Sequence, residues 1–182
     1  MFRQLHELHV VALRADDVDS FLTGLVCVPA LQYLSVSRSL IGARDFATLL
    51  MENLVATCPH LEKLRLDTVP LNCNAVSAVL AGAPRLPRLK WLNVSPMASM
   101  LPTDIFYVLP ELIAAGRHVR ELLFVVPMLQ DDDELAVLRV LALAHEVPFF
   151  CGNLPHNADA YVVDALGAPH KQSDRCRLRI SW

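Results

Sequence analysis

Apolar residues recur along the chain in short groups with the spacing apolar-x-x-Leu-x-apolar. Five groups have this spacing, and their members are Leu5/Leu8/Val10, Leu31/Leu34/Val36, Leu61/Leu64/Leu66, Leu89/Leu92/Val94 and Val119/Leu122/Phe124. Their first members are separated by 26, 30, 28 and 30 residues. One such group arises easily in a leucine-rich chain, but five at a nearly constant interval predict an internal repeat built on short strands.

Two weaker groups continue the series and leave the length of the array open. Ala144/Val147/Phe149 follows 25 residues after the fifth group, and Arg175/Leu178/Ile180 follows 31 residues after that. The array therefore has about five to seven repeats. We expect the repeats to be clear up to about residue 127 and irregular over residues 144–182, within a single domain that spans residues 1–182.

Between these groups the apolar period lengthens from two residues to about 3.6, which predicts a returning helix after each strand. The expected helices cover residues 43–57, a shorter segment around residues 76–80 with Asn74 as its N-cap, residues 135–143 and residues 158–166. Pro110 lies inside the apolar segment 105–115, where we expect a kink or two short helical pieces. Alternating strands and helices of this kind predict an α/β fold.

Composition narrows the class of protein further. The chain has 54% hydrophobic and 19% charged residues, so we expect a folded domain with an apolar core. The net charge of −3 comes from 16 basic and 19 acidic residues that are scattered along the chain, which gives no basic footprint for nucleic acid or an anionic membrane. No apolar run approaches the ~18 to 20 residues of a membrane span, and the first residues do not form a secretory signal. We therefore expect an intracellular, cytoplasmic protein.

Residue types and spacings give no support for catalysis. The five cysteines contain no CxxC pair, which argues against a zinc ribbon or a disulfide framework. Cys151 precedes Gly152, but no glycine-rich oxyanion turn accompanies it. The chain lacks the phosphate-binding patterns GxxxxGK[ST] and GxGxxG. The acidic run at residues 131–134 is explained as the first turn of the helix that follows it. We predict no catalytic residues, no cofactor and no metal site.

Residues 54–66, with the sequence LVATCPHLEKLRL, carry the most specific motif of the chain. This segment resembles the cysteine-containing leucine-rich repeats. Residues 5–127 resemble leucine-rich repeat proteins of that long-repeat type and of the ribonuclease-inhibitor-like type, and the remainder of the chain resembles them poorly. The resemblance implies a solenoid, or horseshoe, with a parallel sheet on its concave face and helices on its convex face. The asparagine usual at the ninth repeat position is replaced here by Leu13, Ser39, Val69, Met97 and Pro127.

In each predicted strand the residues between the apolar positions alternate outward onto the concave face. Tyr33, Arg65 and Trp91 are of the types that dominate binding hot spots, and we predict that they anchor a protein partner. The residues expected to fix the register of that partner are Lys63, Asp67, Asn93 and Glu121. The alternative is that Trp91 only packs against its neighbours and that Arg65 only pairs with Glu62 or Asp67.

The sequence therefore predicts a non-enzymatic interaction module that binds a protein, and neither nucleic acid nor a membrane. Two alternatives remain. One is a substrate-recognition subunit of a cullin-type ubiquitin ligase, which is implied only by the resemblance to F-box-associated repeats, and no F-box precedes the first strand. The other is a structural subunit of a large assembly. Because the end repeats of a solenoid expose apolar surface and a strand edge, we expect at least one end to be covered by a capping partner or by self-association.

Overall fold

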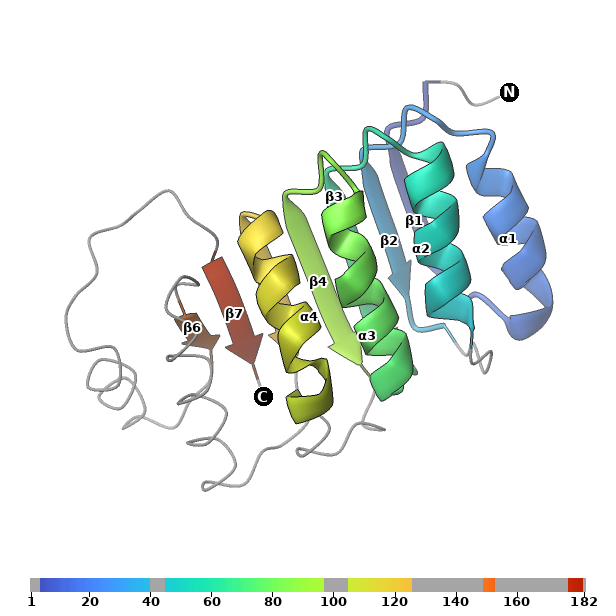
Figure 1. Ribbon diagram of the computed structural model, residues 1–182. Helices are drawn as coiled ribbons and strands as arrows, with labels where there is room; N and C mark the ends of the chain where they lie inside the picture. The colour runs from blue at the N-terminus through green and yellow to red at the C-terminus, as the bar shows by residue number, and fades with distance from the viewer. Residues whose placement is uncertain (1–3, 40–44, 97–104, 126–148, 153–176, 182) are drawn as a thin grey trace, which may run out of the picture.

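The computed structural model describes residues 4–39, 45–96, 105–125, 149–152 and 177–181. Along the chain these residues form the strands and helices β1 (Glu7–Val11), η1 (Ala15–Asp17, a 3-10 turn), α1 (Val18–Leu25), β2 (Tyr33–Ser37), α2 (Phe46–Thr57), β3 (Lys63–Val69), α3 (Cys73–Gly82), η2 (Ala83–Arg85, a 3-10 turn), β4 (Trp91–Pro96), α4 (Ile105–His118), β5 (Glu121–Val125), β6 (Phe149–Gly152) and β7 (Arg177–Ser181). The strands form one parallel sheet in the order β1-β2-β3-β4-β5-β7-β6. The predicted α/β class is confirmed (Figure 1).

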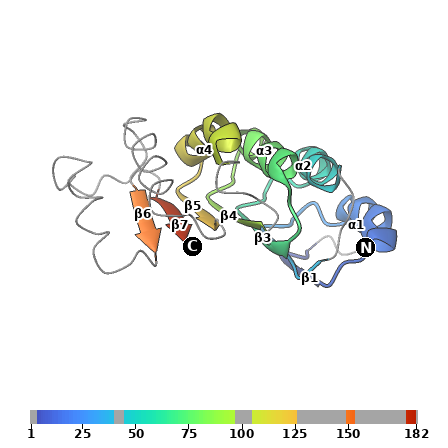
Figure 2. The ribbon, with the colours of Figure 1, turned by 90° about the horizontal axis from the view of Figure 1, so that it is seen from below.

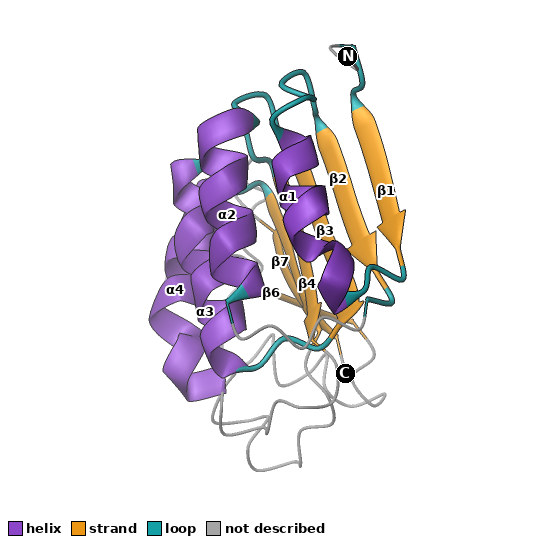
Figure 3. Ribbon diagram, turned by 90° about the vertical axis from the view of Figure 1, so that its right-hand side faces the viewer, coloured by secondary structure: helices purple, strands orange, loops and turns teal. Residues whose placement is uncertain are grey.

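The molecule has two layers, with helices α1 to α4 covering one face of the sheet (Figures 2 and 3). The central leucines of the sequence groups pair in one register, and Leu34, Leu64, Leu92 and Leu122 are all 0% exposed. These side chains face the helices, because a strand directs alternate residues to opposite faces. Burying each one fully contributes about 1.5–3 kcal/mol. The five predicted strands and their common register are therefore confirmed.

A repeated backbone pattern aligns the residues that immediately precede the strands. The carbonyl of Gln32 accepts hydrogen bonds from the N–H groups of Glu62 and Lys63. In the next two repeats the carbonyls of Glu62 and Lys90 act in the same way toward the N–H groups that enter β4 and β5. This pattern places Gln32, Glu62, Lys90 and Arg120 side by side at the amino-terminal ends of the strands, which we call the amino-terminal edge of the sheet.

The carboxyl-terminal ends of the first three strands share a left-handed residue at the same repeat position. Ala12, Arg38 and Thr68 have φ angles of 58°, 51° and 55°. In the turn after β2, the hydroxyl of Ser39 accepts a hydrogen bond from the Leu13 N–H at 3.1 Å and donates one to the Ser37 carbonyl at 3.0 Å. Ser39 thus binds the backbone N–H of Leu13 and the carbonyl of Ser37. It stands at the ninth repeat position, where the sequence comparison above expects asparagine.

Thr68 is the least suited of these three residues to its conformation, because a β-branched side chain crowds the backbone at positive φ. Replacing Thr68 with asparagine, which tolerates this region, is expected to raise the free energy of unfolding by about 0.5–1 kcal/mol. Urea unfolding followed by circular dichroism measures the change. The control is Thr23→Asn in α1, where the backbone is helical and the two residues have similar propensities. A Thr68→Asn chain no more stable than this control contradicts the prediction.

Two details of the helices differ from the sequence-based expectation. The N-cap of α3 is Asn72 rather than Asn74: Asn72 is extended, and its amide oxygen accepts the Ala75 N–H at 2.9 Å. α4 is one continuous helix that contains Pro110, so the expectation of two short helical pieces is wrong, and the kink expected as the other form stays a prediction. Proline has no N–H to donate to the carbonyl one turn earlier in the helix. Because Pro110 is exposed, water can donate to that carbonyl instead. The helix expected over 43–57 is observed as α2, and those expected over 135–143 and 158–166 lie outside the described residues.

The last two strands of the sheet, β7 and β6, do not follow chain order, whereas the strands of a regular repeat series do. β7 pairs directly with β5, and Leu178 and Ile180 lie opposite Leu122 and Phe124. The weak group at residues 175–180 therefore keeps the repeat register. The group at residues 144–149 does not, because Phe149 begins β6 and lies opposite Leu178, two positions from its expected place. Ala144 and Val147 lie outside the described residues.

Cys58, from the CP motif, has a structural position between α2 and β3. Its N–H donates to the Leu54 carbonyl and its own carbonyl accepts the Leu61 N–H, so it links the end of the helix to the next repeat. The side chain is buried, and this burial raises the pKa of the thiol, with a hydrogen bond to Thr57 acting in the opposite direction. Cys58 and Cys27 are free thiols.

Candidate functional site

The face of the sheet opposite the helices carries the residues predicted to bind a partner. We call this surface the outer face. It consists of three rows of residues in register, which are Glu7–Tyr33–Lys63–Trp91–Glu121, His9–Ser35–Arg65–Asn93–Leu123 and Val11–Ser37–Asp67. Strands in a sheet are about 4.8 Å apart, so neighbours in a row are within reach of one ligand. Of the predicted anchors, Tyr33 and Trp91 lie in the first row with Lys63 between them, and Arg65 lies in the second row on the strand between theirs.

Arg65 lies near the centre of the outer face and is held by Asp67. Its Nη2 donates to Asp67 Oδ2 at 2.7 Å, and the two side chains are 42% and 31% exposed. The hydrogen bond that Arg65 donates to Asp67 raises the pKa of the guanidinium, burial lowers it, and Tyr33 adds a smaller increase. Arg65 Nε is buried and has no hydrogen-bond partner among the described residues. Of the two acidic partners considered from the sequence, Asp67 is the one that binds Arg65.

Tyr33 packs against the preceding strand. The rings of Tyr33 and His9 are in T-shaped contact, with centroids 5.0 Å apart and planes at 90°. His9 Nε2 in turn lies 3.9 Å from Glu7 Oε2. An edge-to-face pair of this kind restricts the motion of the Tyr33 ring. Tyr33 therefore lies on the surface as a half-buried, oriented aromatic side chain.

The seven predicted binding residues differ in how much surface they offer. Lys63 and Glu121 are exposed, and Tyr33, Arg65, Asp67 and Trp91 are half-buried. Asn93 is only 5% exposed, so its side chain offers a partner little surface. The sequence pattern does not reveal this difference, because alternation along a strand gives the direction of a side chain but not its neighbours' size. Six of the seven residues remain accessible on the outer face.

A pocket of about 510 Å³ opens on the first row of the outer face. It is lined by Tyr33, Lys63, Lys90, Trp91, Arg120 and Glu121. We call it the outer-face pocket. Four of its residues were predicted as partner contacts, and the structure brings them together. Arg65, Asp67 and Asn93 do not line it. Lys90 and Arg120 were not predicted, because they precede the strands instead of lying within them.

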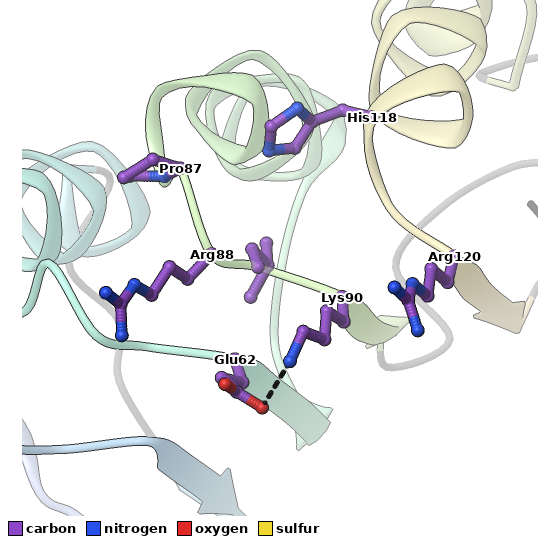
Figure 4. A pocket seen from close by; sticks show the side chains of 7 residues that line it. Glu62, Pro87, Arg88, Lys90, His118 and Arg120 are labelled. Atoms are coloured by element: carbon purple, nitrogen blue, oxygen red, sulfur yellow. Dashed lines mark ion pairs between the residues drawn. The ribbon is translucent and has the colours of Figure 1, made fainter.

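A second pocket of about 440 Å³ lies at the amino-terminal edge of the sheet, and we call it the edge pocket (Figure 4). Its lining residues are Glu62, Pro87, Arg88, Leu89, Lys90, His118 and Arg120. None of these residues was among the predicted partner contacts. Aligning the repeats gives the signal that finds them, because Glu62, Lys90 and Arg120 occupy the same position in successive repeats.

Charge pairing fixes part of the edge pocket. Lys90 Nζ lies 2.9 Å from Glu62 Oε2, and Figure 4 shows the lysine directed at this carboxylate. The hydrogen bond from Lys90 lowers the pKa of Glu62, and the charges of Arg88 and Lys63 lower it further. His118 Nε2 is 2.9 Å from the Leu86 carbonyl oxygen, which accepts a hydrogen bond from it and so ties the end of α4 to the turn before β4. The pocket is therefore a preformed, largely basic cleft.

No protein-family model matches the chain. No curated protein matches it either. Within the described ranges, no helix is long and apolar enough to cross a bilayer. In the same part of the chain, no three His, Cys, Asp or Glu side chains come together as a group that could hold a metal ion.

Proposed function

We propose that the chain is a non-catalytic interaction module that binds a protein partner on the outer face of its sheet. The observation that carries this proposal is the arrangement of Tyr33, Lys63 and Trp91, which lie in register on three adjacent strands and line one pocket. A parallel sheet holds the backbone of these residues rigidly, so little backbone entropy is lost when a partner binds. The activity is recognition.

The same proposal includes the leucine-rich repeat architecture, with about five to seven repeats and a concave outer face. Three features support it, each recurring at a fixed repeat position. They are the buried leucine of each strand, the carbonyl that accepts two N–H groups from the next repeat, and the left-handed residue near the end of the strand. A repeat that reproduces its own turns and register can be extended by stacking.

Trp91 and Tyr33 are the proposed anchors, with Arg65 held between them by Asp67. Half-buried aromatic and arginine side chains give large contact areas while they still reach solvent. The Arg65–Asp67 pair presents both charges on the surface, which favours a partner with complementary polar groups. Lys63 lies between the two aromatic residues and Glu121 lies beside Trp91, and both contribute to orientation rather than to most of the affinity.

A structural subunit of a larger assembly is the second candidate. β1 is at one edge of the sheet, and its Val11 is 62% exposed. An uncovered parallel edge with apolar side chains favours contact with another chain. If this function is correct, the isolated chain self-associates in sedimentation experiments, and Val11→Lys reduces the association. A binding module with a separate partner is instead expected to stay monomeric.

The test of the proposed function is capture of partners from the source cells on the tagged chain. We expect a stoichiometric partner whose recovery falls at least about tenfold with the triple variant Tyr33→Ala, Arg65→Ala, Trp91→Ala, because each anchor is of a hot-spot type. The control variant carries Tyr107→Ala and Arg85→Ala, two exposed side chains on the helical side of the molecule, and is expected to keep the partner. Circular dichroism verifies that both variants are folded. Equal recovery with the triple variant rejects the outer face as the site.

A further inference from the structure

The outer-face pocket and the edge pocket are neighbours, because Lys90 and Arg120 line both of them. We treat the two together as one surface, from the aromatic residues of the outer face to the amino-terminal ends of the strands, and call it the edge groove. It is lined by Tyr33, Glu62, Lys63, Pro87, Arg88, Leu89, Lys90, Trp91, His118, Arg120 and Glu121. A ligand that contacts Lys90 and Arg120 is therefore within reach of both pockets.

Positive charge dominates this groove although the whole chain has a net charge of −3. Its lining has four cationic side chains, Lys63, Arg88, Lys90 and Arg120, and two carboxylates, Glu62 and Glu121. Among the residues that the structure describes, only Lys90 of these cations forms an ion pair. Arg88 and Arg120 lie on either side of Lys90 in Figure 4. The groove thus has unused capacity to bind negative charge.

The repeat itself fixes the spacing of these cations. Backbone hydrogen bonds between repeats place Lys90 and Arg120 at equivalent positions, one strand apart. Arg88 is two residues before Lys90 and lines the edge pocket from the same turn. An arginine binds a carboxylate through two parallel hydrogen bonds, which makes it more specific for this group than a lysine. Two arginines around a lysine suit a ligand with more than one carboxylate.

We propose that the edge groove binds an acidic peptide segment of the protein partner, with its carboxylates on Arg88 and Arg120 and a neighbouring side chain against Trp91. This inference rests on the proposed function, because it names the chemistry of the partner that the outer face binds. Glu62 and Glu121 can accept hydrogen bonds from the N–H groups of a peptide backbone, which are donors that the sugar–phosphate backbone of a nucleic acid lacks. A nucleic-acid site also requires a longer basic track than this groove offers.

The test is fluorescence anisotropy with a labelled hexaglutamate peptide and the full chain. Hexaglutamate is expected to bind, more weakly at about 300 mM than at about 50 mM salt. Charge reversal in the variant Arg88→Glu, Arg120→Glu is expected to weaken binding at least about tenfold, because charge-assisted hydrogen bonds are lost. The matched control is Arg14→Glu, Arg38→Glu, which makes the same change in net charge. These two arginines follow the carboxyl-terminal ends of β1 and β2, whereas the edge groove lies at the amino-terminal ends of the strands. It should change the affinity less than about twofold, as expected for distant screened charges.

Three results overturn the proposal: no binding of hexaglutamate by the unmodified chain, equal weakening in both double variants, or tighter binding of labelled hexauridylate RNA than of hexaglutamate. The milder variant Arg88→Gln, Arg120→Gln keeps the test valid if charge reversal prevents folding, and it should also weaken binding. If a cellular partner still binds Arg88→Glu, Arg120→Glu but not the outer-face triple variant, the acidic-segment proposal is rejected and the proposed function is kept. A partner that the outer-face triple variant retains rejects the proposed function instead.

Discussion

Replacing Leu64 with alanine is expected to lower the free energy of unfolding by about 3 kcal/mol, within the ~2–5 kcal/mol that leucine truncations cost in protein cores. Leu64 is 0% exposed and lies in the interior strand β3, between Leu34 and Leu92 in the register. Truncation removes apolar contacts and leaves a cavity between the sheet and the helices, which neighbouring strands cannot close without losing their hydrogen bonds. Urea unfolding followed by circular dichroism and tryptophan fluorescence measures the loss.

The control for this prediction is Lys63→Ala, one residue earlier in the same strand. Lys63 is exposed on the outer face, so its truncation should change the free energy of unfolding by less than about 0.5 kcal/mol. The two substitutions thus separate the faces of one strand. Equal effects of Leu64→Ala and Lys63→Ala would mean that β3 does not direct these residues to opposite faces. A loss of about 3 kcal/mol is a large fraction of the ~5–15 kcal/mol that stabilises a typical domain.

Leucine periodicity predicts this architecture well because one short pattern specifies both a strand and the face it buries. The spacing of Leu61, Leu64 and Leu66 predicts β3 and its buried side without any knowledge of neighbouring strands. The order of the last two strands is a different problem. Pairing of β7 with β5 depends on which later segment best continues the register of Leu122 and Phe124, and this choice is made across the sheet rather than along the chain.

The candidate site divides in the same way. Tyr33, Arg65 and Trp91 could be assigned to the outer face from alternation alone, because period two applies to every regular strand. The cations of the edge groove were missed because they precede the strands, where no local period applies. Their proximity follows from the hydrogen bonds that each repeat makes with the next, such as those from Arg120 and Glu121 to the Lys90 carbonyl. Position within the repeat, not local charge density, is the signal for this groove.

Gly82 shows how packing between repeats gives a residue a role that its local sequence does not reveal. It is the last residue of α3, where a glycine is normally interpreted as a helix end. Its φ of −75° is allowed for any residue, so the backbone conformation does not require glycine. The requirement is space: a Cβ at this position would lie 2.7 Å from Met51 Cε, 2.9 Å from Met51 Cβ and 3.0 Å from Met51 Cγ. Gly82 therefore allows the close approach of α3 to α2.

Gly82→Ala is accordingly expected to lower the free energy of unfolding by about 2 kcal/mol, the scale of overpacking a dense core. Rotation of the Met51 side chain can move Cε and Cγ away but not its Cβ, so the helices themselves must separate. The control is Gly24→Ala in α1, where nothing lies within 4 Å of the added Cβ. There the higher helix propensity of alanine should raise the free energy of unfolding by up to about 1 kcal/mol. The two substitutions are chemically identical, so opposite changes in the free energy of unfolding, measured with urea, isolate the contact with Met51. A Gly82→Ala chain that is more stable than the unmodified chain would contradict this packing between α2 and α3.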